Sequence, residues 1–513
     1  MHSPAFFKLS HLHITQKGIL SMSRQSGILL HISSLPGPEG IGTLGKEAYA
    51  FADFLHASGM RIWQVLPMGP TGYGESPYQS SSMYAGNPLF ISLRTLRDEG
   101  LVNFSDDELG TDTDPSKVNF GRVREIHDLI LRRAFHQSAS GLSSEMEQFC
   151  HEAPWVSDFA LFTALKSHFD GKMWTAWPDS DIRLRKQDAV QKYQVSLKDE
   201  IHFHVFCQYL FSKQWRALKH YCNQQGISLF GDMPIYVAED SADTWLSPKV
   251  FQLDRNRMPK RVAGVPPDYF SADGQLWGNP LYNWTYLRLT GYHWWLNRMR
   301  HMLQMYDIVR VDHFIGFANY YSIPYGAKNA RNGKWVKAPG KSFFHKLKKE
   351  LPGAHIIAED LGSVNQRVRS LIDYTGFPGM FVLVFGFGGV PSENHHFPDH
   401  WTENSVGYTG THDNDTVLGY LLRADQNEVV CAKQTLHFER LEDGPEAFIC
   451  SVLASPAQTA VLAMQDILHL DNSARMNLPG TIGGNWAYRM QETDISEDIA
   501  EHLYQLNVKY RRQ

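Results

Sequence analysis

The chain has 513 residues, of which 43% are hydrophobic and 20% are charged, and its formal net charge is −5. This composition excludes a disordered chain, a collagen-like fibre and a small disulfide scaffold, and the charge gives no reason to expect binding to nucleic acid or to a membrane. The length allows either three or four domains or one α/β barrel enlarged by insertions. The 13 Trp and 22 Tyr suit flat, hydroxylated ligands such as sugars, although we expect most of them in the core.

The N-terminal region and the cysteines bear on where the protein works. Residues 1–25 contain no continuous apolar stretch and no signal-peptide cleavage site, so we expect a disordered extension outside the fold. No apolar run approaches the roughly 18 residues that a membrane-spanning helix needs. The five cysteines are odd in number and form no C-x-x-C pair, which predicts a reduced, cytoplasmic protein.

In chain order, eight short apolar runs rich in β-branched residues predict eight strands. Loops rich in Gly or Pro follow these runs, and helical periodicity follows the loops. Because the runs are apolar almost throughout, both faces of each strand are expected to be buried, as in a parallel sheet. The runs are 27–31, 61–69, 227–237, 307–314, 355–362, 379–387, 406–413 and 475–481.

Helices are predicted between these strands from apolar positions at helical spacing. Eight β–α units predict a (β/α)₈ barrel over residues 26–513, since eight is the number of units at which such a sheet closes. A doubly wound open sheet satisfies the same alternation and is the alternative. The helices with the clearest periodicity are 46–58, 290–306, 341–351 and 365–374.

Two gaps between the predicted strands are too long for simple crossovers. Residues 95–225, between the second and third strands, predict a mainly helical inserted subdomain. Residues 238–290, between the third and fourth strands, are rich in Gly, Pro, Asn and Trp and predict a loop-rich subdomain over the active site. One helix at 491–510 ends the chain, so no room remains for a C-terminal β-sandwich.

Carboxylates recur where the predicted strands end, and in a barrel these ends meet at one mouth. Arg310 and Asp312 stand two apart on one strand face, so Arg310 could hold Asp312 ionised, although a purely structural ion pair is the alternative. Of Glu359 and Asp360, only one can point into the mouth, and we expect it to be Glu359. Neighbouring carboxylates would raise its pKa, as a general acid needs. Two carboxyls about 5–5.5 Å apart are typical of retaining glycoside chemistry.

The same segments resemble the conserved regions of the α-amylase clan. They resemble more closely the amylomaltase (4-α-glucanotransferase, disproportionating enzyme) family, glycoside hydrolase family 77, and the likeness extends from Ser26 to Arg489. The matching segments include SGILLHISSLPGPEGIGTLG, WQVLPMGPTGYGESPYQSSSMYAGNP, GDMPIYVAEDSADTW, GVPPDYFSADGQLWGNPLYNW, VRVDHFIGF, IAEDLG, YTGTHDNDT and RMNLPGTIGGNW. A set of this size is highly specific.

The resemblance implies roles for individual residues. Asp312 resembles the family's nucleophile, Glu359 its acid/base and Asp413 its transition-state stabiliser, while Arg310 resembles the partner of the nucleophile. The residues that resemble sugar-binding positions are Asp232, His313 and His412 near the cleavage point, Asp268, Phe270 and Trp277 on the acceptor side, Tyr73, Ser76 and Tyr78 on the other rim, and Asn477 after the eighth strand.

The resemblance also implies an activity. It is the transfer of α-1,4-glucan segments between maltooligosaccharides or glucans, with no cofactor and no metal ion. A hydrolase that uses the same carboxylates is one alternative, and a barrel that binds glucan without catalysis is another. The intact carboxylates argue against binding without catalysis. Two departures from the family pattern, Ile32-Ser33 and the loop 394–401, bear on substrate length. Nothing in the sequence specifies an oligomeric state.

Three further motifs have simpler explanations. The G-x-G-x-x-G at 40–45 lies too far from its strand, and Asp53 follows it too early, for a dinucleotide site, so we expect a turn. The polar loop 393–400 carries three histidines and two acids but lacks a metal-site spacing. His31 could bind sugar or be a buried histidine with satisfied ring nitrogens, and the sequence leaves both interpretations open.

Overall fold

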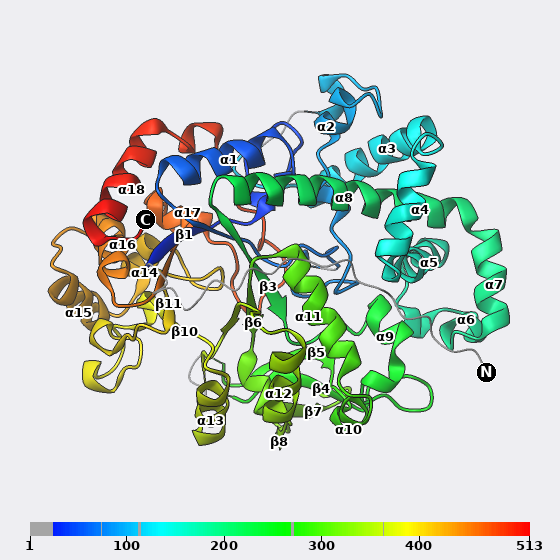
Figure 1. Ribbon diagram of the computed structural model, residues 1–513. Helices are drawn as coiled ribbons and strands as arrows, with labels where there is room; N and C mark the ends of the chain where they lie inside the picture. The colour runs from blue at the N-terminus through cyan, green and yellow to red at the C-terminus, as the bar shows by residue number, and fades with distance from the viewer. Residues whose placement is uncertain (1–23, 73, 111–113, 268–270, 363) are drawn as a thin grey trace.

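The computed structural model describes residues 24–513 except 73, 111–113, 268–270 and 363. Eight parallel strands form one sheet that curls into a nearly closed barrel (Figure 1). The strands are β1 (Gln25–Leu29), β2 (Ile62–Gln64), β3 (Ser228–Pro234), β6 (Ile308–Asp312), β9 (Ile356–Ala358), β10 (Gly379–Val382), β11 (Ser405–Tyr408) and β12 (Thr459–Ala463).

The strand order identifies the sheet as a barrel rather than a doubly wound sheet. Neighbours follow chain order throughout, and the first strand, β1, pairs in parallel with both β2 and the last strand, β12. An open doubly wound sheet reverses its strand order at a switch point and leaves first and last strands apart. Between β9 and β10, the Ala358 N–H donates to the Pro378 carbonyl at 2.9 Å. The expected (β/α)₈ fold is therefore confirmed.

The eighth strand does not lie where the sequence predicts it. The run 475–481 is a loop, and β12 is the short segment TAVLA at 459–463. This segment lies in a longer apolar stretch and closely follows a helix of that stretch. Pro456 ends that helix, α16 (Gly444–Ala454), and separates it from the strand. The other seven predicted runs each overlap a strand of the barrel.

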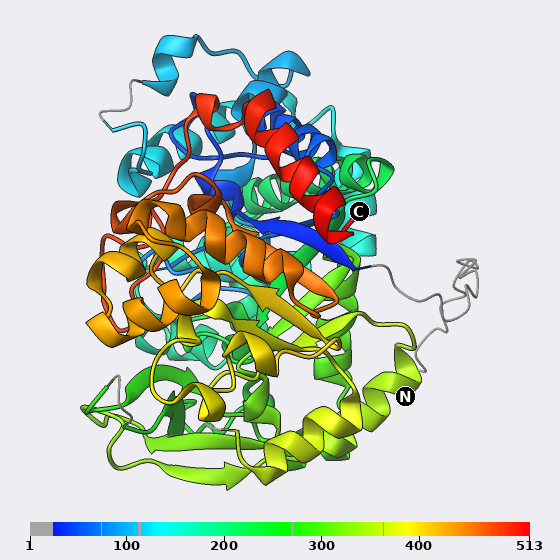
Figure 2. The same ribbon diagram turned by 90° about the vertical axis from the view of Figure 1, so that its left-hand side faces the viewer.

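Helices surround the barrel. The clearly periodic segments form α1 (Lys46–Ala57), α11 (His293–Met305), α12 (Gly340–Glu350) and α13 (Gln366–Thr375), close to their predicted bounds. The last helix, α18 (Glu497–Tyr510), begins at Glu497 rather than at 491, and packs beside α1 near the start of β1 (Figure 2). The remaining α-helices outside the insertions are α14 (Val417–Arg423), α15 (Gln426–Leu436), α16 and α17 (Met464–Ile467).

The segment between β2 and β3 is helical, and most of it forms a lobe beside the barrel (Figure 1). Its longest helix, α8, instead packs along the barrel against α1 and β3. The lobe has an apolar core that includes Phe162, Trp174 and Trp177, and Trp245 of the following segment packs into it. The helices are α2 (Leu93–Asp98), α3 (Phe120–Ser138), α4 (Ser143–Glu152), α5 (Trp155–His168), α6 (Ser180–Arg183), α7 (Gln187–Ser196) and α8 (Lys198–Gln224).

The segment 238–290 is more regular than the loop-rich subdomain expected from the sequence. It holds α9 (Ala242–Leu246), β4 (Arg261–Val265), β5 (Gln275–Pro280) and α10 (Trp284–Leu289). β4 and β5 join a four-stranded antiparallel sheet, in the order β5-β4-β7-β8. Its other strands, β7 (Asn319–Pro324) and β8 (Lys334–Lys337), follow β6 and form an insertion that the sequence analysis missed.

The fold begins two residues earlier than predicted. Gln25 is the first residue of β1, and the Arg24 guanidinium donates to the carbonyls of Leu453 and Tyr510. Residues 1–23, which make up most of the expected extension, lie outside the described residues. Within the part of the chain that the structure describes, no helix is long and apolar enough to span a membrane.

Candidate active site

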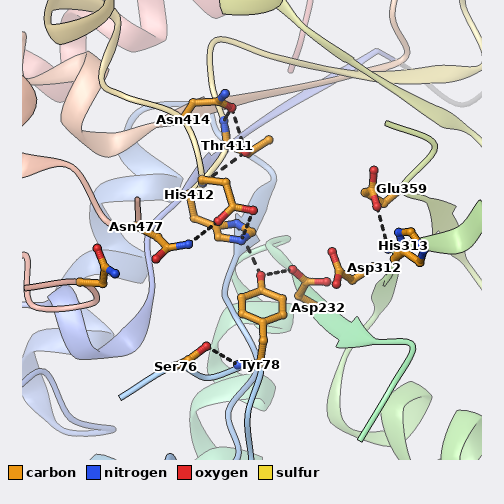
Figure 3. A network of polar contacts seen from close by, with 12 residues as sticks. Ser76, Tyr78, Asp232, Asp312, His313, Glu359, Thr411, His412, Asn414 and Asn477 are labelled. Atoms are coloured by element: carbon orange, nitrogen blue, oxygen red, sulfur yellow. Dashed lines mark hydrogen bonds and ion pairs between the residues drawn. The ribbon is translucent and has the colours of Figure 1, made fainter. Parts of the chain in front are cut away.

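A groove of about 1180 Å³ opens at the carboxyl ends of the barrel strands. Asp312 is the last residue of β6, Glu359 follows β9, and Asp413 follows β11 by five residues. All three carboxylates line the groove. In Figure 3, Asp312, Glu359 and His313 lie on one side, Asn477 and His412 lie on the other, and Tyr78 stands between them. The residues that the sequence places at the strand ends are therefore brought together in one cavity.

Arg310 links two of the strand-end carboxylates. Its Nη1 donates to Asp232 Oδ2 on the neighbouring strand β3, and its Nη2 donates to Asp312 Oδ1 at 3.0 Å. In the parallel register, Arg310 lies opposite Asp232, and Asp312 lies opposite Pro234. Arg310 and Asp312 thus share a strand face, as their spacing predicts.

Asp232 is fully buried, with an exposed fraction of 0%. Besides Arg310, it accepts a hydrogen bond from the Tyr78 hydroxyl at 2.6 Å. The sequence analysis expected Asp232 to bind sugar hydroxyls. In the structure Asp232 contacts two side chains that line the groove, Arg310 and Tyr78.

Burial raises the pKa of Asp312 well above its ordinary value. The Arg310 guanidinium opposes this rise, while the carboxylates of Asp232, Glu359 and Asp413 add to it. Arg310 therefore favours the ionised form of Asp312, as expected, but burial has the larger effect on the pKa. The Asp312 side chain keeps 28% of its surface exposed, facing the groove.

Glu359 is held by the backbone of two loops. Its Oε2 accepts from the His313 N–H and its Oε1 from the Leu361 N–H, both at 2.7 Å. Burial raises the pKa of Glu359 to about 7, and Arg310 opposes that rise. The pKa of Glu359 is raised, as expected, but the main cause is burial rather than the neighbouring carboxylates. Asp360 points the other way and accepts from the Met380 N–H at 2.9 Å.

His313 contacts both Glu359 and Trp277. Its backbone has a φ of 51°, in the left-handed region that is uncommon for residues other than glycine, and this conformation accompanies the N–H contact to Glu359. Its ring meets Trp277 edge to face, with centroids 4.8 Å apart. Burial lowers the pKa of His313 to about 4, so the ring is neutral at pH 7. Its buried Nε2 has no hydrogen-bond partner among the described residues.

Asp413 is the most open of the three carboxylates, with 46% of its side chain exposed. Asn477 Nδ2 donates to its Oδ1 at 2.6 Å, and His412 Nε2 lies 3.4 Å from its Oδ2. Burial lowers the pKa of His412, and the Asp413 charge opposes this effect. The Tyr78 ring stacks on His412, with centroids 5.0 Å apart and planes 16° apart.

The remaining expected residues fall into two groups. Ser76 and Trp277 line the groove, and Ser76 Oγ accepts from the Tyr78 N–H at 3.3 Å. Tyr73, Asp268 and Phe270 lie outside the described residues. Sequence reasoning missed Trp486, Tyr236 and Phe385, which also line the groove. Trp486 closes the motif RMNLPGTIGGNW, so its place in that motif was the available signal.

The three further motifs serve the fold locally. His31 is buried, accepts from the Leu66 N–H through Nδ1 at 3.2 Å and packs against Phe90, which favours the interpretation as a buried histidine. A Cβ at Gly42 would meet the Ile32 carbonyl at 1.8 Å, so this glycine permits the turn. In the loop 393–400, His400 Nδ1 lies 2.7 Å from the Asn394 carbonyl. The described residues hold no group of three or more potential metal ligands.

Known proteins resemble this chain over nearly its whole length. A family model described as 4-alpha-glucanotransferase matches residues 30–495. The 4-alpha-glucanotransferase of Streptococcus pneumoniae serotype 4 is 45% identical over 495 residues, which cover 95% of this chain and 97% of that protein. The corresponding protein of Clostridium butyricum is 42% identical over 487 residues, which cover 94% of this chain and 100% of that protein.

A solved structure agrees with these sequence comparisons. The amylomaltase from Streptococcus agalactiae, determined in complex with acarbose, matches with a TM-score of 0.93 and 40% identity, over 95% of this chain and 99% of that one. The family resemblance read from the motifs is confirmed. The chain therefore belongs to the 4-alpha-glucanotransferase family.

Proposed function

We propose that this protein transfers segments of α-1,4-glucan between maltooligosaccharides by a retaining double displacement. The observation that carries the proposal is the convergence of Asp312, Glu359 and Asp413 on one groove. Its volume of about 1180 Å³ exceeds the range of roughly 300–1,000 Å³ usual for small-ligand pockets, and so suits several sugar units in a row.

In the first step, Asp312 attacks the anomeric carbon and Glu359 gives its proton to the leaving glycosidic oxygen. A covalent glycosyl-enzyme forms, and the shortened chain departs. The pKa of about 7 supports a protonated Glu359 in free enzyme near neutral pH. Asp312 keeps the Arg310 contact and more exposure than Glu359, and both features favour the ionised form that a nucleophile needs.

In the second step, Glu359 takes the proton from the 4-hydroxyl of an acceptor sugar, whose oxygen attacks the anomeric carbon and releases Asp312. Asp413 stabilises the positive charge of the sugar in both transition states, because its carboxylate is open to the groove. His313 is suited to bind a hydroxyl near the cleavage point, since its neutral ring has an unpartnered Nε2.

Transfer requires an acceptor sugar to compete with water. Trp277 stands against His313, next to the acid, and offers an apolar face on which an acceptor ring can stack. Asp268 and Phe270, which we expect on the same side, belong to the segment just before β5. An acceptor held there would exclude water from the glycosyl-enzyme.

Incubation with maltotriose tests the proposal. Transfer yields glucose together with chains longer than three units, hydrolysis yields glucose and maltose without longer chains, and binding alone leaves maltotriose unchanged. Absence of longer products would contradict the transferase. Asp312→Asn is the matched control for the nucleophile, and substantial transfer by that variant would contradict its role.

We place this reaction in the cytoplasm. The five thiols are free in the structure, and a reducing compartment keeps them so. The substrates are then maltooligosaccharides or α-1,4-glucans of the same compartment. Fractionation of the native host, with the transfer activity followed across fractions, tests this location.

A further inference from the structure

Arg475 stands immediately behind the groove, at the start of the loop that follows the short helix Asn472–Ala474. Its Nη2 donates to the main-chain carbonyl of Asp413, and its Nε donates to the main-chain carbonyl of Asn477, both at 2.7 Å. Asp413 and Asn477 are themselves joined by a side-chain hydrogen bond of 2.6 Å. The two residues are therefore tied together twice, once through Arg475 and once directly.

The position of Arg475 separates it from the residues that meet substrate. Among the described residues that line the groove are Asp413 and Asn477 but not Arg475. Arg475 instead lines a small cavity of about 20 Å³ together with His31 and His412. Any influence on the reaction must then pass through the residues that it holds.

The charge of Arg475 is arranged so that the carboxylate of Asp413 stays available. The guanidinium contacts the carbonyl of Asp413, not its carboxylate, and its Nη1 lies 3.7 Å from the Asp415 carboxylate. Asp415 is also approached by Arg423, whose Nη1 lies 3.8 Å away. Asp415 thus balances the positive charge, and the negative charge of Asp413 remains free to face a cationic sugar.

We propose that Arg475 is a positioning residue for the transfer reaction, one that holds Asp413 and Asn477 at a fixed place relative to Asp312. The inference rests on the proposed function, because it assumes that Asp413 stabilises the transition state. A guanidinium suits the task since its rigid fork reaches two carbonyls at once, whereas a lysine ammonium is a single flexible point charge.

Three variants test the inference. Arg475→Lys keeps the charge but loses the fork, and Arg475→Met removes both. Arg423→Met is the matched control, because Arg423 shares the Asp415 contact, is exposed and contacts neither Asp413 nor Asn477 in the described structure. Hydrogen exchange of peptides covering 411–416 and 476–486 measures the anchoring, and kcat and KM with maltotriose measure its consequence.

Both Arg475 variants should speed exchange in the two peptides and lower kcat by about 10- to 100-fold while KM changes little, since a small displacement of a catalytic group has that effect. Arg423→Met should leave exchange, kcat and KM within about twofold of the parent, as for an ordinary surface change. Loss of thermal stability without this kcat-specific effect would show a merely structural role and overturn the inference.

The outcomes distinguish the inference from the proposed function. If the parent protein forms no product from maltotriose, the proposed function fails. In that case hydrogen exchange can still show whether Arg475 anchors the two peptides. The inference fails together with the proposed function, because there is no transfer reaction for Arg475 to assist. If the parent protein transfers glucan and Arg475→Lys exchanges and turns over as the parent does, only the inference is overturned.

Discussion

At the scale of single residues, the proposed mechanism depends on how burial changes the pKa of Glu359. An ordinary glutamate is ionised at neutral pH, whereas the Glu359 pKa of about 7 leaves the acid form available. In the proposed mechanism the same residue later acts as a base, and a pKa near the working pH serves both steps.

The pH dependence of kcat/KM follows from this pKa. Glu359 is protonated below about pH 7 and loses its proton above it, so kcat/KM for maltotriose should fall on the alkaline side with an apparent pKa near 7. A glycosyl fluoride donor needs no proton for its leaving group, and its glycosylation rate should lack this fall. An unchanged kcat/KM for maltotriose between pH 6 and 9 would contradict the assignment.

The positions of the strand-end residues in the groove were predictable from sequence in part. The motifs and the strand ends point to Asp312, Glu359 and Asp413, and a strand period of two places Arg310 beside Asp312. The burial of Asp232 was not predictable, because it depends on how Tyr78 and Arg310 close over it. Trp486 was also missed, because its contact with Tyr78, at a centroid separation of 5.8 Å, joins residues far apart in sequence.

At the scale of elements, the two ends of the fold are fastened at the carboxyl end of α16. Arg512 is fully buried and donates to the carbonyls of Leu453, Ser455 and Gln25. Arg24 donates to Leu453 as well. Cations at a helix C-terminus are favoured by the helix dipole and satisfy carbonyls that have no partner within the helix.

Removing the buried guanidinium should destabilise the protein without touching the groove. Arg512→Met leaves several buried carbonyls without donors, which costs about 3–5 kcal/mol of the free energy of unfolding. Urea denaturation should show this loss, while kcat per folded molecule stays at the parent value. Arg511→Met is the matched control, because Arg511 is exposed and adjacent. Equal stability of the two variants would contradict this account.

The elements also show where sequence reasoning fails. Seven strands were recognisable because each is apolar and stands alone between polar or Gly-rich segments. The eighth, β12, was missed because it lies between two apolar helices, and the loop at 475–481 resembled a strand in its place. The antiparallel sheet was missed because β4 and β7 pair across the intervening strand β6, and such long-range register is not visible in local periodicity.

At the scale of the whole molecule, the insertions build the walls of the groove on the mouth of the barrel. β5 belongs to the antiparallel sheet and carries Trp277, while the loop that follows β12 contributes Asn477 and Trp486 to the lining. The barrel supplies the carboxylates, and the antiparallel sheet supplies an aromatic side chain beside them.

The balance between transfer and hydrolysis should therefore depend on Trp277. Trp277→Ala removes the stacking surface beside His313 but leaves the three carboxylates in place. A larger share of glycosyl-enzyme should then react with water, and the ratio of reducing ends released to longer chains formed should rise several-fold. Trp335→Ala is the control, because Trp335 is an exposed tryptophan of the same sheet that does not line the groove. An unchanged ratio in Trp277→Ala would contradict this role for the acceptor wall.

The central claim is that Asp312 forms a covalent bond to the sugar. The most direct measurement uses Glu359→Gln with an α-glycosyl fluoride, a donor that can load the enzyme without acid assistance while the missing base slows its release. Peptide mapping by mass spectrometry should find one glycosyl adduct, on the peptide that contains Asp312, and none when Asp312→Asn is added. An adduct on another carboxylate, or turnover of the fluoride by the double variant at the rate of Glu359→Gln, would contradict the account.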